Sequence, residues 1–218
     1  MTHLKLKTIA NSLRRIQYRG VFCMKFPFDL VLYQMIIHEV RPDLIIEIGT
    51  LYGGSALYFA DLMTTMGIDG EVHTIDIEVP KEEENIRTPN VEVGQLALDH
   101  PKIKFFKEGY EKYDLKNIEG FKTILVIDDG SHIYKDVKGA LDKFAGIVTP
   151  GSYYIVEDGN AEETCSPYVW GTLEGGPLRA IYEFVSSGKY PYYIDLHKCD
   201  FFGIDSTYNT YGYLKKAR

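Results

Sequence analysis

Short apolar runs and amphipathic segments alternate along most of this chain. Residues 123–127 form a nearly continuous apolar run, as expected of a parallel strand buried on both faces. The pattern predicts strands at 44–48, 72–75, 102–106, 123–127 and 152–156. Helices are expected at 28–40, 54–66, 111–119, 133–146 and 178–187. This alternation predicts an α/β fold with a doubly wound, Rossmann-like sheet that is mostly parallel.

The two ends of the chain and one internal segment depart from this alternation. Residues 190–196 and 208–214 read as two closing strands, which we expect to form an antiparallel pair at the sheet edge. Residues 1–27 are expected to form an N-terminal arm, and residues 28–218 a single domain. Residues 78–100 are polar and acidic and are predicted to form a long insertion between strands.

Composition narrows the classes of partner and compartment. The chain has 218 residues, of which 45% are hydrophobic, and a formal net charge of −7. This charge disfavours nucleic acids and anionic membranes as partners. Three cysteines without a Cys-x-x-Cys pair favour a reducing, cytoplasmic location. No apolar stretch approaches the roughly 18 residues of a membrane span, and we expect no signal peptide.

The most informative stretch is residues 44–55, in which an apolar strand leads into a glycine turn and a helix start. Its pattern, Glu47-x-Gly49-x-x-x-Gly53-Gly54-Ser55, differs from the G-x-G-x-x-G pattern of dinucleotide sites. The Glu47 carboxylate would repel a pyrophosphate, so a cationic ligand such as S-adenosylmethionine fits better. Gly49 and Gly53 would let the backbone approach that ligand closely. The alternative is that the glycines only tighten the turn.

Acidic residues also end the other predicted strands. Asp76 follows 72–75 and could accept the ribose hydroxyls of an adenosine. Asp129 follows 123–127, and Glu157 with Asp158 follows 152–156. If those two strands are neighbours, the three carboxylates could share one Mg²⁺. A solvated acidic rim, with Asp129 capping the next helix, is the alternative.

His132 stands three residues after Asp129, at the start of the next predicted helix. A neutral imidazole there could act as a general base, and the alternative is a surface or capping histidine. Tyr168 and Trp170, in a glycine-containing loop, could stack on a substrate ring or serve as packing anchors.

The segments Arg19-Gly20, Glu47-Ile-Gly49, Gly53-Gly54-Ser55, Asp128-Asp129-x-x-His132 and Glu157-Asp158, together with Pro42, resemble the cephalosporin hydroxylase family. Despite its name, this is a group of class I S-adenosylmethionine-dependent methyltransferases. The Asp-Asp-Gly-Ser-His stretch is also similar to that of metal-dependent macrolide-sugar O-methyltransferases. The resemblance covers roughly residues 17–160.

The resemblance implies roles for individual residues. Asp129, Glu157 and Asp158 would bind Mg²⁺, and His132, together with Asp129, would be catalytic. The residues expected to contact S-adenosylmethionine are Glu47, Gly49, Thr50, Gly53, Ser55, Asp76, Ile77, Gly109 and Asp128. The resemblance alone implies a homo-oligomer.

The function predicted from the sequence is a Mg²⁺-dependent O-methyltransferase. Its acceptor would be a small molecule with a free hydroxyl, such as a sugar or another diol. Three alternatives are an NAD-dependent oxidoreductase, a non-haem iron hydroxylase and a non-catalytic cofactor-binding scaffold. The absence of G-x-G-x-x-G speaks against the first, and the absence of His-x-Asp/Glu against the second. A scaffold would not need Asp129, His132, Glu157 and Asp158 together.

Overall fold

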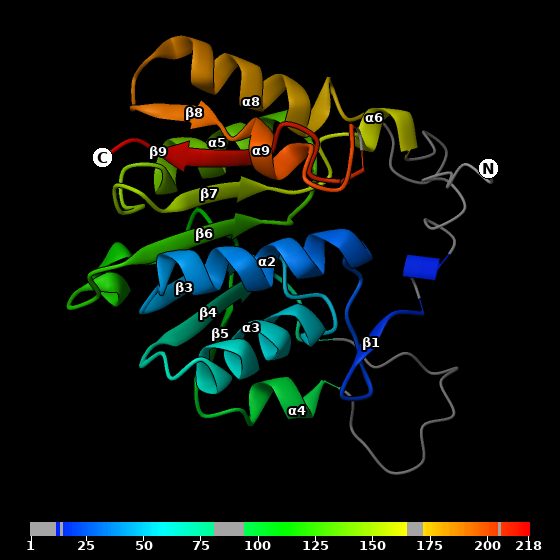
Figure 1. The fold of residues 1–218 in the computed structure, drawn as a ribbon. Helices are drawn as coiled ribbons and strands as arrows, with labels where there is room; N and C mark the ends of the chain where they lie inside the picture. The colour runs from blue at the N-terminus through cyan, green and yellow to red at the C-terminus, as the bar shows by residue number, and fades with distance from the viewer. Residues whose placement is uncertain (1–11, 14, 81–93, 165–171, 205) are drawn as a thin grey trace.

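The computed structural model describes residues 12–13, 15–80, 94–164, 172–204 and 206–218. A seven-stranded sheet with the order β5-β4-β3-β6-β7-β9-β8 forms its centre (Figure 1). The strands are β3 (Leu44–Ile48), β4 (Glu71–Asp76), β5 (Ile103–Lys107), β6 (Ile124–Asp128), β7 (Tyr153–Val156), β8 (Tyr192–Ile194) and β9 (Tyr213–Lys216). The first five are parallel, and β9 is antiparallel to both β7 and β8. The predicted doubly wound sheet with an antiparallel edge is therefore confirmed.

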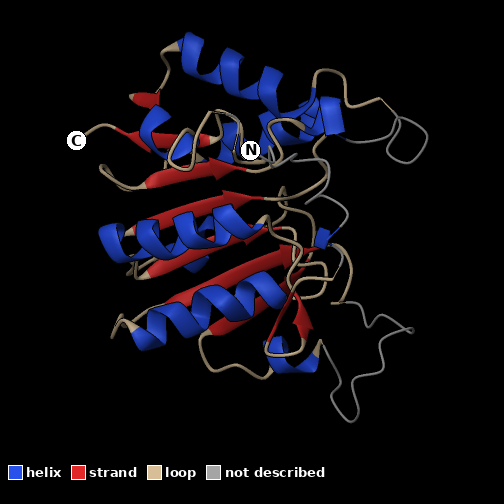
Figure 2. Cartoon of the chain, turned by 45° about the vertical axis from the view of Figure 1, so that its right-hand side comes forward, coloured by secondary structure: helices blue, strands red, loops and turns tan. Residues whose placement is uncertain are grey.

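Helices cover both faces of the sheet, as Figure 2 shows. One face carries α2 (Pro27–Val40) and α3 (Gly54–Thr65), and the other carries α5 (Tyr134–Phe144) and α8 (Gly176–Ser187). Successive residues of a strand face opposite sides, which gives two separate cores. In β6, Leu125 and Ile127 pack under α2 and α3, whereas Val126 packs under α5.

The remaining elements are short. They are α4 (Gln95–Leu98), the 3-10 helix η1 (Leu115–Ile118), α6 (Ala161–Thr164) and α9 (Leu196–Cys199). The helix predicted at 111–119 is thus reduced to one turn, N-capped by the Asp114 side chain, which accepts a hydrogen bond from the Lys116 amide. The last strand was predicted at 208–214 but runs over 213–216, because the residues before it form hydrogen bonds with Asp29 and Tyr33 of α2 instead of pairing in the sheet.

Part of the predicted arm forms a hairpin that packs on the domain. Strands β1 (Gln17–Tyr18) and β2 (Val21–Phe22) are joined by Arg19 and Gly20, both with positive φ. Arg19 forms an ion pair with Asp61 of α3 at 2.9 Å. The chain then passes across the start of α3 and enters α2.

Asp29, in the first turn of α2, ties this helix to the segment before β9. Its buried carboxylate accepts hydrogen bonds from the Thr207 hydroxyl, the Tyr208 amide at 3.1 Å and the Tyr213 hydroxyl at 2.9 Å. Burial raises the pKa of Asp29 to about 6, although these hydrogen bonds lower it. The C-terminal segment is therefore fastened to the N-terminal end of α2.

Of the helices in the described ranges, none is long and apolar enough to cross a membrane.

We expect Asp29→Asn to lower the free energy of unfolding at pH 7.5 by about 1–3 kcal/mol, because an amide has one acceptor oxygen for three donors. Protonation at a raised pKa stabilises the folded wild type as the pH falls, and asparagine lacks this effect. The difference in the free energy of unfolding between the variant and the wild type should therefore grow by roughly 1 kcal/mol as the pH falls from 7.5 to 5. Urea unfolding at both pH values checks this. Glu39→Gln, which removes exposed ion pairs, should cost about 1 kcal/mol or less.

Candidate active site

The site lies where the strand order changes direction. The chain proceeds from β3 outward to β4 and β5, then returns to β6 on the other side of β3. Such a switch point opens a crevice beyond the carboxyl ends of the two central strands. Backbone hydrogen bonds continue past the strands there: the Asp129 amide donates to Ile48 and the Glu157 amide donates to Asp128, both at 2.9 Å. The predicted adjacency of the Asp129 and Glu157 strands is confirmed.

The glycines of the first turn are required by the packing of the protein itself. Gly49 has φ +94°, and a Cβ on it would lie 2.1 Å from the Asp129 carbonyl oxygen. A Cβ on Gly54 would lie 2.0 Å from the Phe22 carbonyl oxygen, and one on Gly53 would lie 2.7 Å from the Ala97 Cβ. The glycine turn therefore allows close contact with β6, with the hairpin and with α4.

Asp76 fixes the same turn from the end of β4. Its Oδ2 accepts the amides of Thr50 at 2.9 Å and Leu51 at 3.0 Å. Ile77 follows, and this apolar side chain is 71% exposed. Gly109 lies beside it, since a Cβ on Gly109 would lie 3.8 Å from the Ile77 Cγ2. These residues, predicted to contact the cofactor, form one wall next to the glycine turn.

Glu47 lies beneath the turn and has no exposed surface. The Thr74 hydroxyl donates to its Oε2 at 2.6 Å, and the Thr50 hydroxyl is 2.7 Å from that of Thr74. Within the described residues, no well-formed hydrogen bond reaches Glu47 Oε1. Burial raises the pKa of this carboxyl, and the Lys25 charge opposes the shift. Ser55, in the first turn of α3, is also buried.

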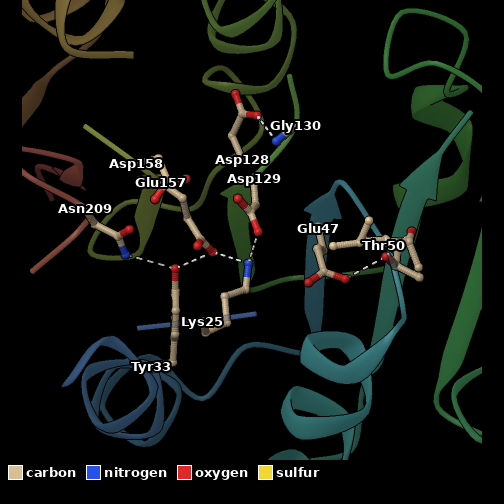
Figure 3. A network of polar contacts seen from close by, with 12 residues as sticks. Lys25, Tyr33, Glu47, Thr50, Asp128, Asp129, Gly130, Glu157, Asp158 and Asn209 are labelled. Carbon is tan, nitrogen blue, oxygen red and sulfur yellow. Dashed lines mark hydrogen bonds and ion pairs between the residues drawn. The ribbon is translucent and has the colours of Figure 1, made fainter. Parts of the chain in front are cut away.

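The Asp128-Asp129 pair divides between the two faces of the sheet. Asp128 is buried beside Tyr154, whose hydroxyl is 3.4 Å from Oδ2, and burial raises the pKa of Asp128 to about 7. Asp129 points toward the α2 side instead, as Figure 3 shows. The alternation of side chains at the end of β6 explains this division.

Asp129, His132 and Asp158 form a compact cluster that could hold a metal ion. One ligand atom from each lies within 4.8 Å of the others. The His132 Nε2 is 3.6 Å from Asp129 Oδ1 and 3.4 Å from Asp158 Oδ2. His132 and Asp158 have φ values of 58° and 53°, which are uncommon for residues other than glycine. Both conformations occur where the residues that follow β6 and β7 come together.

Glu157, the third predicted metal ligand, faces a different set of partners. The Lys25 ammonium donates to Glu157 Oε1 at 2.6 Å and also to Asp129 Oδ2. The Tyr33 hydroxyl donates to the same Glu157 oxygen at 2.6 Å and accepts from the Asn209 amide at 3.1 Å (Figure 3). Burial raises the pKa of Glu157, and the Asp129 charge adds to this effect.

Lys25, Tyr33 and Asn209 were not predicted as site residues. One signal was available for Lys25, because it is the only charged residue in the otherwise apolar run Val21–Phe28. Its partners are 104 and 132 residues away in the sequence, so pairing could not be predicted. Tyr168 and Trp170 lie outside the described residues, as does most of the predicted insertion.

Comparisons with known proteins place this geometry in a family. A family model described as Rhamnosyl O-methyltransferase/CmcI matches residues 11–217, which extends the resemblance beyond the expected 17–160. The Rhamnosyl O-methyltransferase of Mycobacterium leprae (strain TN) is 31% identical over 199 residues, covering 90% of this chain and 81% of that protein. The Rhamnosyl O-methyltransferase of Mycobacterium tuberculosis (strain ATCC 25618 / H37Rv) is 32% identical over 193 residues, covering 88% and 75%.

Solved structures share the fold at lower identity. CmcI-N160 with SAH has a TM-score of 0.63 and 21% identity, covering 93% of this chain and 83% of that chain. CmcI-D160 with Mg and SAM has a TM-score of 0.61 and 23% identity, covering 94% and 78%.

We expect Gly49→Ala to lower the free energy of unfolding by at least about 2 kcal/mol more than Gly67→Ala. Both glycines have positive φ, but nothing lies within 4 Å of a Cβ on Gly67. The matched pair therefore separates the clash with Asp129 from the cost of the backbone conformation. Urea unfolding of both variants measures it, and equal losses would contradict the packing role.

Proposed function

Because the chain belongs to the Rhamnosyl O-methyltransferase/CmcI family of S-adenosylmethionine-dependent O-methyltransferases, we propose that it transfers a methyl group to a sugar or another small molecule with a diol, and that this transfer depends on Mg²⁺. The observation that carries the proposal is the Asp129–His132–Asp158 cluster beside the glycine turn. A methyl donor and a hydroxyl acceptor held at this edge of the sheet would meet over these side chains. Placing two reactants together is a large part of the catalysis of such a transfer.

The methyl donor is proposed to lie along the 49–55 turn. The buried Glu47 carboxyl lies beneath this turn, where an acidic group favours a ligand with sulfonium and ammonium charges over a pyrophosphate. Asp76 at the end of β4 would face the ribose, and the exposed Ile77 side chain with Gly109 would flank the adenine. Thr50, Gly53, Ser55 and Asp128 complete the proposed contacts, either directly or by supporting the turn.

The donor set at the cluster suits a hard divalent cation. Mg²⁺ is commonly held by one or two carboxylates and keeps open positions for water or substrate oxygens. Asp129 and Asp158 would supply these carboxylates, with Glu157 adjacent. When bound, such an ion lowers the pKa of a hydroxyl that coordinates it.

His132 is proposed as the base that takes the proton of the acceptor hydroxyl. Its Nε2 lies 3.6 Å from Asp129 Oδ1 and 3.4 Å from Asp158 Oδ2, so these two carboxylates hold the ring at the site. Asp129 and Asp158 thus orient the ring as well as offering metal ligands.

The class of the methyl acceptor is inferred from the names of the related proteins. Both Mycobacterium proteins are called Rhamnosyl O-methyltransferase, which favours a deoxysugar or a similar diol here. The same proposal includes a homo-oligomeric assembly. It also includes a single domain over residues 28–218, preceded by an arm over residues 1–27. The buried free thiols of Cys23 and Cys199 support a reducing, cytoplasmic location.

Calorimetric titration should show that the protein binds S-adenosylmethionine, and that Asp76→Ala weakens binding about tenfold or more. The substitution removes the acceptor proposed for the ribose and releases the 50–51 turn. Asp114→Ala, at the exposed start of η1, is the matched control and should bind like wild type. Binding of NAD in place of S-adenosylmethionine would move the protein to the oxidoreductases.

Asp129→Ala should reduce methyl transfer by about 100-fold or more, because it removes a metal ligand and one partner of His132. Release of S-adenosylhomocysteine from a panel of rhamnosides, other diol glycosides and catechols measures turnover, with Mg²⁺ or with chelator. Binding of S-adenosylmethionine should remain within about threefold of wild type. Full activity of the variant in chelator would reject the metal, and binding without turnover on any acceptor would favour a scaffold.

A further inference from the structure

The cation already present in the acidic site is Lys25. Its side chain is 2% exposed, and it lies in the short segment between the N-terminal hairpin and α2. A buried ammonium is costly unless carboxylates compensate it. Lys25 has two such partners, Asp129 and Glu157, which come from the ends of β6 and β7.

We propose that Lys25 is a resident counter-cation of the acidic site and that it sets the affinity of this site for divalent ions. The inference rests on the proposed function, in which Asp129 and Asp158 hold Mg²⁺. It assigns to Lys25 a positioning role toward the metal, with no direct contact to the reacting atoms.

The oxygens of the site are divided between two cations. Asp129 directs Oδ2 to Lys25 and leaves Oδ1 facing His132 and, beyond it, Asp158. Glu157 Oε1 receives both the Lys25 ammonium and the Tyr33 hydroxyl. Lys25 therefore competes with a divalent ion for one oxygen of Glu157 and for one oxygen of Asp129. Figure 3 shows the Lys25 ammonium between Asp129 and Glu157.

The charges agree with this division. When Asp129, Glu157 and Asp158 are all ionised, their charges and that of the Lys25 ammonium sum to −2, which is equal and opposite to the charge of one divalent ion. Replacing Lys25 by a neutral residue leaves −3 and removes a positive charge that repels the ion. At the effective dielectric constant of a partly buried site, a unit charge a few ångströms away changes ion affinity by about tenfold or more.

Lys25 acts here as a fixed charge. Its ammonium forms ion pairs with both Asp129 and Glu157, and two carboxylate partners compensate the buried positive charge. A lysine that stays protonated can compete with a metal ion but cannot serve as the general base.

The test is calorimetric titration of Mg²⁺ and Mn²⁺ into wild type, Lys25→Met and Lys25→Arg. The matched control is Lys216→Met, because Lys216 is also buried but, among the described residues, donates to the carbonyl oxygens of Ala145, Gly146 and Val148 and to no carboxylate. We expect Lys25→Met to bind the ions about tenfold or more tightly than wild type. Lys25→Arg, which keeps the charge, and Lys216→Met should stay within about threefold of wild type.

A second comparison covers the case in which Lys25→Met alone does not fold. Replacing both members of a buried ion pair leaves no uncompensated charge and is often tolerated. In the Glu157→Gln background, adding Lys25→Met should again tighten ion binding about tenfold relative to Glu157→Gln alone.

The outcomes separate this inference from the proposed function. If the wild type binds the ions and Lys25→Met does not tighten this binding in either background, the role of Lys25 is overturned and the metal site stays in place. Binding by Lys25→Met but not by wild type supports the role of Lys25 and rejects Mg²⁺ dependence of the natural protein. Binding by neither protein rejects both.

Discussion

The ion pairs of Lys25 with Asp129 and Glu157 are the interaction on which the arrangement of the site depends. Parallel strands bring their carboxyl ends to one edge, and in this chain those ends carry acidic residues. Carboxylates gathered in a partly buried crevice repel one another and lose hydration. Lys25 offsets both costs from a segment that lies outside the main sheet. The path of the chain from the hairpin into α2 is therefore part of the candidate site.

The polar network continues from this ion pair to the other end of the chain. Tyr33 of α2 links Glu157 to Asn209, and Asn209 also donates to the Tyr213 hydroxyl, which donates to Asp29. Residues from both termini thus stabilise the carboxylates of the central strands. Because each member is buried and bonded to the next, the network specifies one arrangement more strongly than isolated pairs would.

How much the sequence could predict depended on whether a feature was local. The apolar run at 123–127 and the acidic residues after each strand placed Asp76, Asp129 and Glu157 at one edge, since strand direction alone determines which ends meet. Lys25 could not be predicted, because its partners are distant in the sequence. The start of β9 was also misjudged. The alternating pattern at 208–214 resembles a strand, but Tyr208 and Asn209 take part in buried contacts with α2.

The glycine turn shows why a motif alone does not identify a ligand. Gly49 and Gly53 suggested close approach of a cofactor, yet contacts within the protein already require both of these glycines and Gly54 as well. Better evidence of function comes from features that packing does not explain. Ile77 is an exposed apolar side chain at the end of β4. His132 and Asp158 both adopt left-handed backbone conformations and face each other at 3.4 Å. Strained residues that converge in this way are typical of sites where a precise geometry is needed.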